Sequence, residues 1–121
     1  MKTLSKIALR KFSTELKKVK YKHVLHELRL EYCTDDNGYV FIHINVIKIK
    51  KPEQQKGWGT QVMYDILRFA DEHNVRLELY VSNAFGSSIE RLYRFYGKLG
   101  FIWVTGDKDG KMIRLAQNNS N

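Results

Sequence analysis

The sequence predicts a single α/β domain in which one central mixed β-sheet is flanked by helices. Its 121 residues are the usual size of one domain with one core. Segments with helical periodicity alternate with segments of strand-like alternation, in the order helix, two strands, helix, strand, helix, two strands. No linker or internal repeat divides the chain, so we expect residues 1–121 to form one domain.

An amphipathic helix is expected from Thr3 to about Lys20, because apolar residues recur there every three or four positions and lysines fill the positions between. The segments His23 to Cys33 and Tyr39 to Ile49 alternate apolar and polar residues. The turn-forming residues 35–38 lie between them, which predicts an antiparallel hairpin. Unless a β-bulge shifts the register, one face of the second strand carries Tyr39, Phe41, His43, Asn45 and Ile47.

The second half of the chain predicts a strand-helix-strand unit and a closing hairpin. A helix opens at Gly57-Trp58-Gly59 and ends near Asn74, before a short strand over 75–81. The strands 39–49 and 75–81 are therefore expected to be parallel. A third helix runs to about Lys98, a hairpin pairs 101–104 with 111–115, and the polar residues 116–121 predict a flexible tail.

Charge and composition restrict the partners and the compartment. Lysine and arginine outnumber aspartate and glutamate by 21 to 13, for a net charge of +8. This excess favours an anionic partner, and it equally fits basic side chains that only solvate exposed faces. One cysteine excludes an internal disulfide, and no apolar run approaches a membrane span, so we expect a soluble cytoplasmic protein. His23 and His26 would face opposite sides of a strand, and we expect no metal site.

The loop Gln54-Gln55-Lys56-Gly57-Trp58-Gly59-Thr60 is the strongest candidate for a binding site. It joins an apolar strand to a helix, and a helix N-terminus offers unpaired N–H groups to a phosphate while glycines let the backbone approach it. The loop does not match the dinucleotide fingerprint, because Val62 stands at the third glycine position. It does not match the P-loop either, because no Gly-Lys-Ser/Thr follows.

Two segments resemble motifs of the GNAT superfamily of N-acetyltransferases. Gln54-x-x-Gly57-x-Gly59 is similar to the family's Arg/Gln-x-x-Gly-x-Gly/Ala, and Leu92 to Phe101 is similar to its later Phe-Tyr-x-x-x-Gly-Phe segment. Together they cover about residues 39–104. The chain departs from the family at 89–92, where Asn-x-x-Ala is expected, and much of the usual N-terminal part is reduced to one helix.

The resemblance implies a site for acetyl-CoA as acyl donor and no metal. Backbone N–H groups from Gln55 to Thr60 would hold the pyrophosphate, with Lys56 adding charge. The strand residues 44–49, Ile47 and Ile49 among them, would pair with the pantetheine arm in a slot formed by splaying from the strand 75–81. Asn83 would add a polar contact, and Trp58 would serve as packing or as shelter for the adenine. The implied cofactor-binding set is Ile47, Ile49, Gln54, Gln55, Lys56, Gly57, Trp58, Gly59, Thr60 and Asn83.

The resemblance also suggests two proton carriers. Tyr96 matches the family's tyrosine at the helix end, where it would protonate the departing thiolate, and its alternative role is that of a core tyrosine. His43 would be the general base, since histidine can accept a proton near neutral pH, and its alternative role is structural. Glu31 and Tyr32 are substitutes for the base, and Asn45 would orient water or substrate.

The resulting functional hypothesis is an acetyl-CoA-dependent N-acetyltransferase that transfers an acetyl group to an amine, such as a protein lysine or N-terminus. The alternative hypothesis is a non-catalytic GNAT-like module whose basic N-terminal helix binds nucleic acid or a partner protein. The two glycines, Gln54 and Tyr96 favour the enzyme, and the positive charge favours the module.

Overall fold

The computed structural model describes residues 3–81, 89–104, 106 and 110–117. Its element order confirms the predicted alternation of helices and strands. Within the described residues, no helix is long and apolar enough to cross a membrane. The elements are α1 (Lys6–Glu15), the π-helix η1 (Leu16–Lys20), β1 (Leu25–Thr34), β2 (Val40–Ile49), the 3₁₀ turn η2 (Lys51–Glu53), α2 (Trp58–Glu72), β3 (Arg76–Tyr80), α3 (Ile89–Lys98), β4 (Ile102–Trp103) and β5 (Lys111–Arg114).

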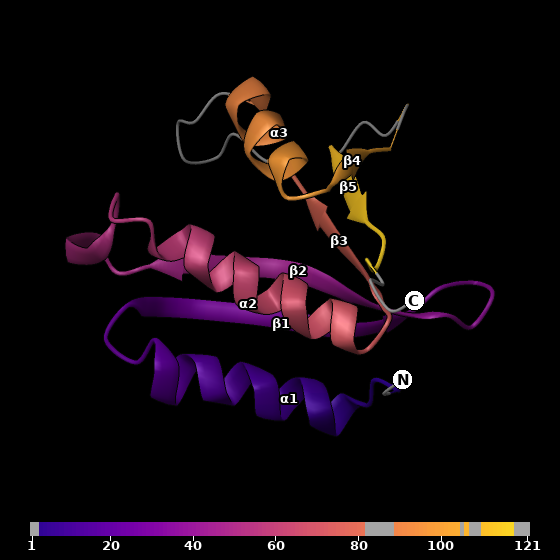
Figure 1. The fold of residues 1–121 in the computed structure, drawn as a ribbon, viewed down its shortest axis with the longest axis horizontal. Coiled ribbons are helices and arrows are strands. Elements are labelled where there is room, and N and C mark those ends of the chain that lie inside the picture. The colour runs from indigo at the N-terminus through magenta and orange to yellow at the C-terminus, as the bar shows by residue number, and fades with distance from the viewer. Residues whose placement is uncertain (1–2, 82–88, 105, 107–109, 118–121) are drawn as a thin grey trace.

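The strands form one mixed sheet in the order β1-β2-β3-β5-β4 (Figure 1). The pair β2 and β3 is parallel, as the strand-helix-strand passage predicted, and the other pairs are antiparallel. The parallel pairing covers only Phe41 to His43 on β2 and Arg76 to Glu78 on β3. Beyond that point β2 continues to Ile49, whereas β3 turns away from it in Figure 1. The two parallel strands are therefore splayed.

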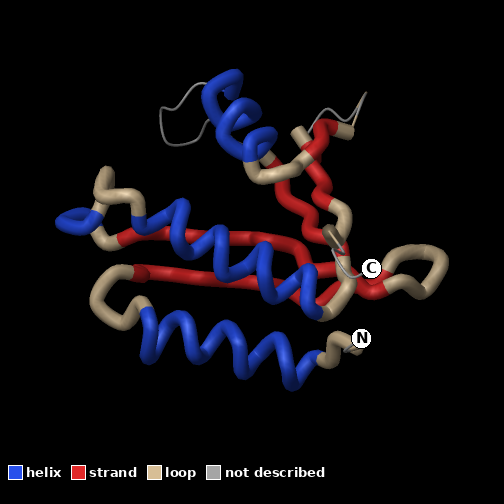
Figure 2. Tube along the Cα trace, viewed as in Figure 1, coloured by secondary structure: helices blue, strands red, loops and turns tan. Residues whose placement is uncertain are grey.

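Helices α1 and α2 lie side by side over one face of the sheet (Figure 2). The ring of Phe12 on α1 stacks on Phe69 of α2 at 4.1 Å between centroids. Helix α3 lies over the other half of the sheet, where Tyr93 contacts Trp103 of β4 at 6.2 Å. The core between these layers is centred on four fully buried side chains: Ile42, Val62, Ile66 and Leu77.

The first helix is shorter than its periodicity predicted and changes its pitch. It begins at Lys6 because the Ser5 hydroxyl accepts a hydrogen bond from the Ala8 amide at 3.0 Å and so caps the N-terminus. After Leu16 the chain winds as a π-helix, in which the Tyr21 amide donates to the Leu16 carbonyl at 2.8 Å. The wider turn ends with Tyr21 in the core, where it is 2% exposed.

A β-bulge at Asn45 corrects the predicted faces of β2. Leu30 pairs with Ile44 and Arg29 with Val46, so Asn45 is the extra residue that the bulge inserts. The insertion shifts every later side chain to the opposite face. Ile47 therefore packs against the core and does not share a face with His43, which is the exception that the predicted alternation allowed for a bulge.

The C-terminal segment that was expected to be a flexible tail is held at its start. The Gln117 amide donates to the Asp71 carboxylate at 2.8 Å. The remaining tail residues, 118–121, lie outside the described residues.

Candidate functional site

The loop between β2 and α2 is shaped by two left-handed residues. Gln55 has φ of 64° and Gly57 has φ of 86°. The left-handed conformation costs a non-glycine residue about 1 kcal/mol, so its presence at Gln55 marks a loop whose shape is imposed by its surroundings. The Gln54 side chain contributes to that shape, because its amide Nε2 donates to the Ile49 carbonyl at 3.1 Å. Backbone of this kind can form a concave nest for an anion.

The N-terminus of α2 leaves its first N–H groups available. Gly57 is the N-cap residue, and it has no side chain to cap the helix. The Gln61 amide is the first to bond back, to the Gly57 carbonyl at 3.2 Å. The amides of Trp58, Gly59 and Thr60 precede it, in the helical positions that have no intrahelical acceptor. They combine with the helix dipole to favour an anion.

Gly59 is not required by the packing of the chain itself. A Cβ atom built on it meets nothing within 4 Å, and its φ is not in the left-handed region. Alanine would favour a helix by about 1 kcal/mol over glycine. The missing side chain keeps the backbone accessible from outside, which fits a ligand that approaches the first turn of α2. Gly57 differs, because its positive φ is itself a reason for glycine.

A basic groove of about 1020 Å³ adjoins this loop and the end of β2. Three lysines line it, and no carboxylate is among the described residues that do so. The sequence-predicted residues Ile47, Ile49, Gln54 and Gln55 border the same groove, whereas the Lys56 side chain pairs with Glu53 at 3.6 Å. The groove is lined by His26, Ile47, Lys48, Ile49, Lys50, Lys51, Pro52, Gln54 and Gln55.

Trp58 connects the loop to the hydrophobic core. Its ring packs against the core and meets Tyr21 edge-on at 6.2 Å, so its packing role is the one observed. Its indole Nε1 is buried without a hydrogen-bond partner among the described residues. The Tyr21 hydroxyl donates to Asp65 on α2 at 2.6 Å, and Lys20 pairs with the same carboxylate at 2.9 Å. Burial raises the pKa of Tyr21, and the bond to Asp65 raises it further.

The contact between Tyr21 and Asp65 beneath the loop was not predicted from the sequence. Asp65 interrupts the apolar stripe of α2, and a buried carboxylate needs a partner, so the interruption was the available signal. Its partner Tyr21 stands 44 residues earlier, and no local pattern connects the two.

Tyr96 lies on the inner side of α3, in an aromatic cluster with Phe95 and Phe101 at 5.1 and 5.7 Å. Burial raises the pKa of its hydroxyl, which keeps the proton in place at neutral pH. That hydroxyl makes no hydrogen bond to another described residue, which leaves its proton available. Both features suit a proton donor.

His43 lies on the opposite face of the sheet from Tyr96. Its ring is 5.5 Å from that of Tyr80, and its strand register places it between Glu31 and Glu78. Asn45 donates to Glu31 at 2.8 Å, so the polar candidates on this face form one cluster. Asn83 lies outside the described residues. Within the described ranges, no three His, Cys, Asp or Glu side chains gather in a way that would hold a metal ion.

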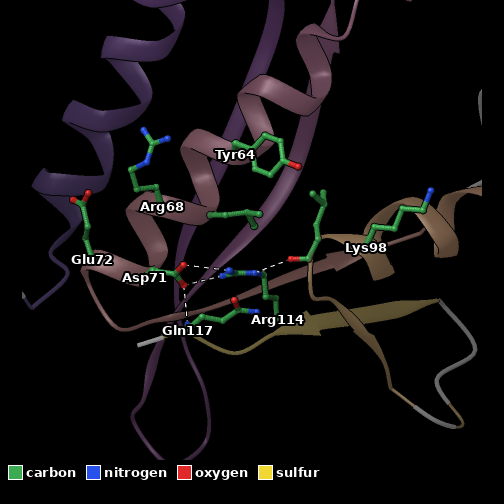
Figure 3. Close-up of a pocket in the computed structure, with 9 residues that line it drawn as sticks. Tyr64, Arg68, Asp71, Glu72, Lys98, Arg114 and Gln117 are labelled. Atoms are coloured by element: carbon green, nitrogen blue, oxygen red, sulfur yellow. Dashed lines mark hydrogen bonds and ion pairs between the residues drawn. The ribbon is translucent and has the colours of Figure 1, made fainter. Parts of the chain in front are cut away.

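A second cavity, of about 640 Å³, lies between α2 and the end of α3 (Figure 3). Its floor is the guanidinium of Arg114, which donates to the Asp71 carboxylate at 2.8 and 3.2 Å and to the Leu99 carbonyl at 2.9 Å. Arg114 is 4% exposed. Because these bonds join β5 to α2 and to the end of α3, the cluster is a structural tie between elements.

Comparison with known proteins finds solved structures that share this fold. No protein-family model matches the sequence, and neither does any curated protein. Solved structures do match. The AtaTR complex bound with acetyl-CoA has a TM-score of 0.56 at 16% identity, over 94% of this chain and 82% of that one. Naa50 of Arabidopsis thaliana, in complex with the bisubstrate analogue CoA-Ac-MVNAL, has a TM-score of 0.52 at 14% identity, over 92% of each chain.

The anti-CRISPR protein AcrVA5 also matches, with a TM-score of 0.51 at 21% identity, over 71% of this chain and 86% of that one. A mutant AtaT toxin bound to acetyl-CoA and the C-terminus of the antitoxin AtaR is matched over only 55% of its length, so this chain spans about half of that toxin. The described residues thus form a mixed-sheet α/β domain with the same fold as these solved structures. The chain has the fold of the GNAT superfamily, which the two sequence motifs predicted.

Proposed function

We propose that this chain is an acetyl-CoA-dependent N-acetyltransferase. One observation supports the proposal most directly. The splay of β2 from its parallel neighbour β3 leads into a left-handed loop and an uncapped helix N-terminus, where Gly59 has no role in the chain's own packing. A module that had lost acyl-CoA binding would have no physical need for that combination. Acetyl-CoA complexes among the solved structures of the same fold support the same donor.

The chain's backbone supplies most of the proposed binding contacts. The amides of Trp58 to Thr60 would hold the pyrophosphate, and the edge of β2 that faces β3 would, beyond His43, pair with the amide groups of the pantetheine arm. Lys48, Lys50 and Lys51 add positive charge along the groove, where it offsets the phosphates. Gln54 acts indirectly, by holding the loop against the Ile49 carbonyl.

The bound donor would supply an activated acetyl thioester, and two side chains of this chain would handle the protons. Tyr96 holds a proton on its Oη and gives it to the leaving sulfur. His43, on the other face of the sheet, accepts the proton of the attacking amine, and Asn45 orients water or substrate beside it. The acceptor is an amine, for which we propose a protein lysine or N-terminus. It would reach His43 across the sheet face that no described helix covers.

Acetyl-CoA should stabilise this protein against heat, and Gly59→Val should abolish that effect. Ligand at a hundred times its Kd contributes about 2.7 kcal/mol to the folded state, which is several degrees in melting temperature for a chain of this size. The valine branches would stand where the pyrophosphate must approach the backbone. Differential scanning fluorimetry with and without acetyl-CoA measures the shift.

The space around Gly59 provides the control for this experiment. Because a Cβ meets nothing there, both Gly59→Ala and Gly59→Val should fold without ligand, and the shift of each variant is measured from its own ligand-free melting temperature. We expect the alanine variant to retain part of the shift. A parent protein that does not respond to acetyl-CoA would contradict the proposed function.

His43→Ala should lower turnover most strongly near neutral pH and recover part of it at alkaline pH. Without the general base, the rate depends on acceptor amine that has already lost its proton, and that fraction rises with pH. A pH-rate profile of parent and variant measures this. His23→Ala is the matched control, because His23 is an exposed histidine in the turn before β1 and does not line the basic groove. If His43→Ala lowers the melting temperature but leaves the shape of the profile unchanged, His43 is structural.

A further inference from the structure

The open edge of the sheet lies beside the basic face of α1. Strand β1 is ten residues long and stands at the end of the strand order, so its outer backbone groups have no strand partner among the described residues. Such an edge is a template for another extended chain. Helix α1 runs along the same edge, and a groove of about 350 Å³ separates the two elements.

The groove is basic on its walls and apolar at its floor. Lys6, Arg10 and Lys17 line it from the helix side and Arg29 from the strand side, over a floor that includes Leu9 and Leu28. No acidic residue is among its described lining residues. Arg29 pairs with Glu27 at 2.8 Å, but Lys6, Arg10 and Lys17 form no ion pair within the described part of the chain. Three exposed cations therefore face the groove without a counter-charge.

The spacing of Lys6 and Arg10 matches the side-chain repeat of an extended chain, and Lys17 lies further along the same row. Lys6 and Arg10 are four residues apart on a helix, which is a rise of about 6 Å, and Lys17 follows about 10 Å further along. Side chains on one face of a β-strand repeat about every 6.6 Å. A strand paired with β1 that carries an acidic residue at every second position would thus place carboxylates along the same row of cations.

A second copy of this chain fits the edge poorly. Pairing of β1 with β1 about a two-fold axis would bring the two α1 helices to the same side of the joined sheet, with their lysine and arginine rows facing each other. Like charges at that distance repel. Nucleic acid offers phosphates to the cations, but it has no backbone that pairs with a strand edge.

We propose that this surface, the α1/β1 groove, binds an acidic protein segment that adds to β1 as an extra β-strand. Backbone hydrogen bonds to the edge provide affinity, and alternate acidic side chains in the groove provide specificity. This interaction is separate from acetyl transfer, since the groove shares no lining residue with the basic groove at the β2–α2 loop. The two proposals can therefore fail independently.

The test uses a fluorescent ten-residue peptide of alternating glutamate and threonine, titrated into the full chain and followed by anisotropy. The double substitution Arg10→Glu and Lys17→Glu should weaken binding by about tenfold or more, since it places like charges opposite the peptide carboxylates. The matched control is Lys11→Glu with Lys18→Glu. It makes the same change in charge on the same helix at exposed lysines outside the groove, and it should bind within about twofold of the parent.

Two modified peptides test the backbone pairing. In a strand with this alternation, the glutamate amides point to one edge and the threonine amides to the other. N-methylation of one set should abolish binding, and N-methylation of the other should leave it intact. Equal loss for groove and control variants, or binding that neither methylated peptide impairs, overturns the proposal. So does a result in which single-stranded RNA shows the groove dependence and the peptide does not bind.

Discussion

Tyr96→Phe should lower the turnover rate by on the order of tenfold to a thousandfold, the range of general acid-base contributions, while acetyl-CoA binding stays nearly unchanged. The substitution removes only a hydroxyl from a side chain whose ring stays packed between Phe95 and Phe101. Because burial raises the pKa of this hydroxyl, the parent protein keeps it protonated over the physiological range. Steady-state kinetics and the acetyl-CoA thermal shift of the variant measure the two quantities.

A second tyrosine on α3 provides a control for this variant. Tyr93→Phe removes a hydroxyl from the same helix, where the ring faces Trp103, and it should turn over at close to the parent rate. A Tyr96→Phe variant as fast as the parent would assign Tyr96 to the core alone. Loss of rate together with loss of the thermal shift would instead indicate that the hydroxyl contributes to donor binding.

Arg114→Met should be the most destabilising single substitution that we predict, at roughly 3 kcal/mol of unfolding free energy. Methionine keeps the apolar part of the side chain. It leaves the Asp71 carboxylate without its bidentate partner and the Leu99 carbonyl without its donor (Figure 3). Arg68→Met is the control. Arg68 stands on the same helix as Asp71, its side chain is 68% exposed, and its loss should cost less than about 0.5 kcal/mol. Urea unfolding of both variants measures the difference.

The effect of Arg114→Met should depend on pH. Burial alone would raise the pKa of Asp71, but the hydrogen bonds from Arg114 and Gln117 outweigh it and hold that pKa below its usual value. A lowered pKa in the folded state adds stability above the unfolded pKa of about 3.9, and this stability is lost as the pH falls through the folded value. The difference in stability between parent and variant should therefore narrow in acid. A difference that stays constant from neutral pH to pH values well below 3.9 would show that the charge of Asp71 contributes nothing.

Local patterns in the sequence were sufficient for the order of the elements and for the position of the loop. Helical periodicity, strand alternation and turn residues act between positions a few residues apart, so each can be interpreted without knowing what packs against it. This is why the parallel pair around α2, the glycines at 57 and 59, and the resemblance to GNAT proteins were all predictable. The slot between β2 and β3 was implied by the resemblance to GNAT proteins. The short stretch over which these two strands pair agrees with it.

Only the tertiary structure determined which side chains lie on the same face and which side chains contact each other. The bulge at Asn45 depends on how β1 pairs with β2, and it moved Ile47 to the core without any local sign in the sequence. Tyr21 and Asp65 meet across 44 residues beneath the loop. The cations Lys6, Arg10 and Lys17 line a groove only because the N-terminal helix packs beside the open edge of β1. Strand pairing and helix docking join residues distant in sequence, and they are settled by which packing of the whole chain buries the most apolar surface with its polar groups paired.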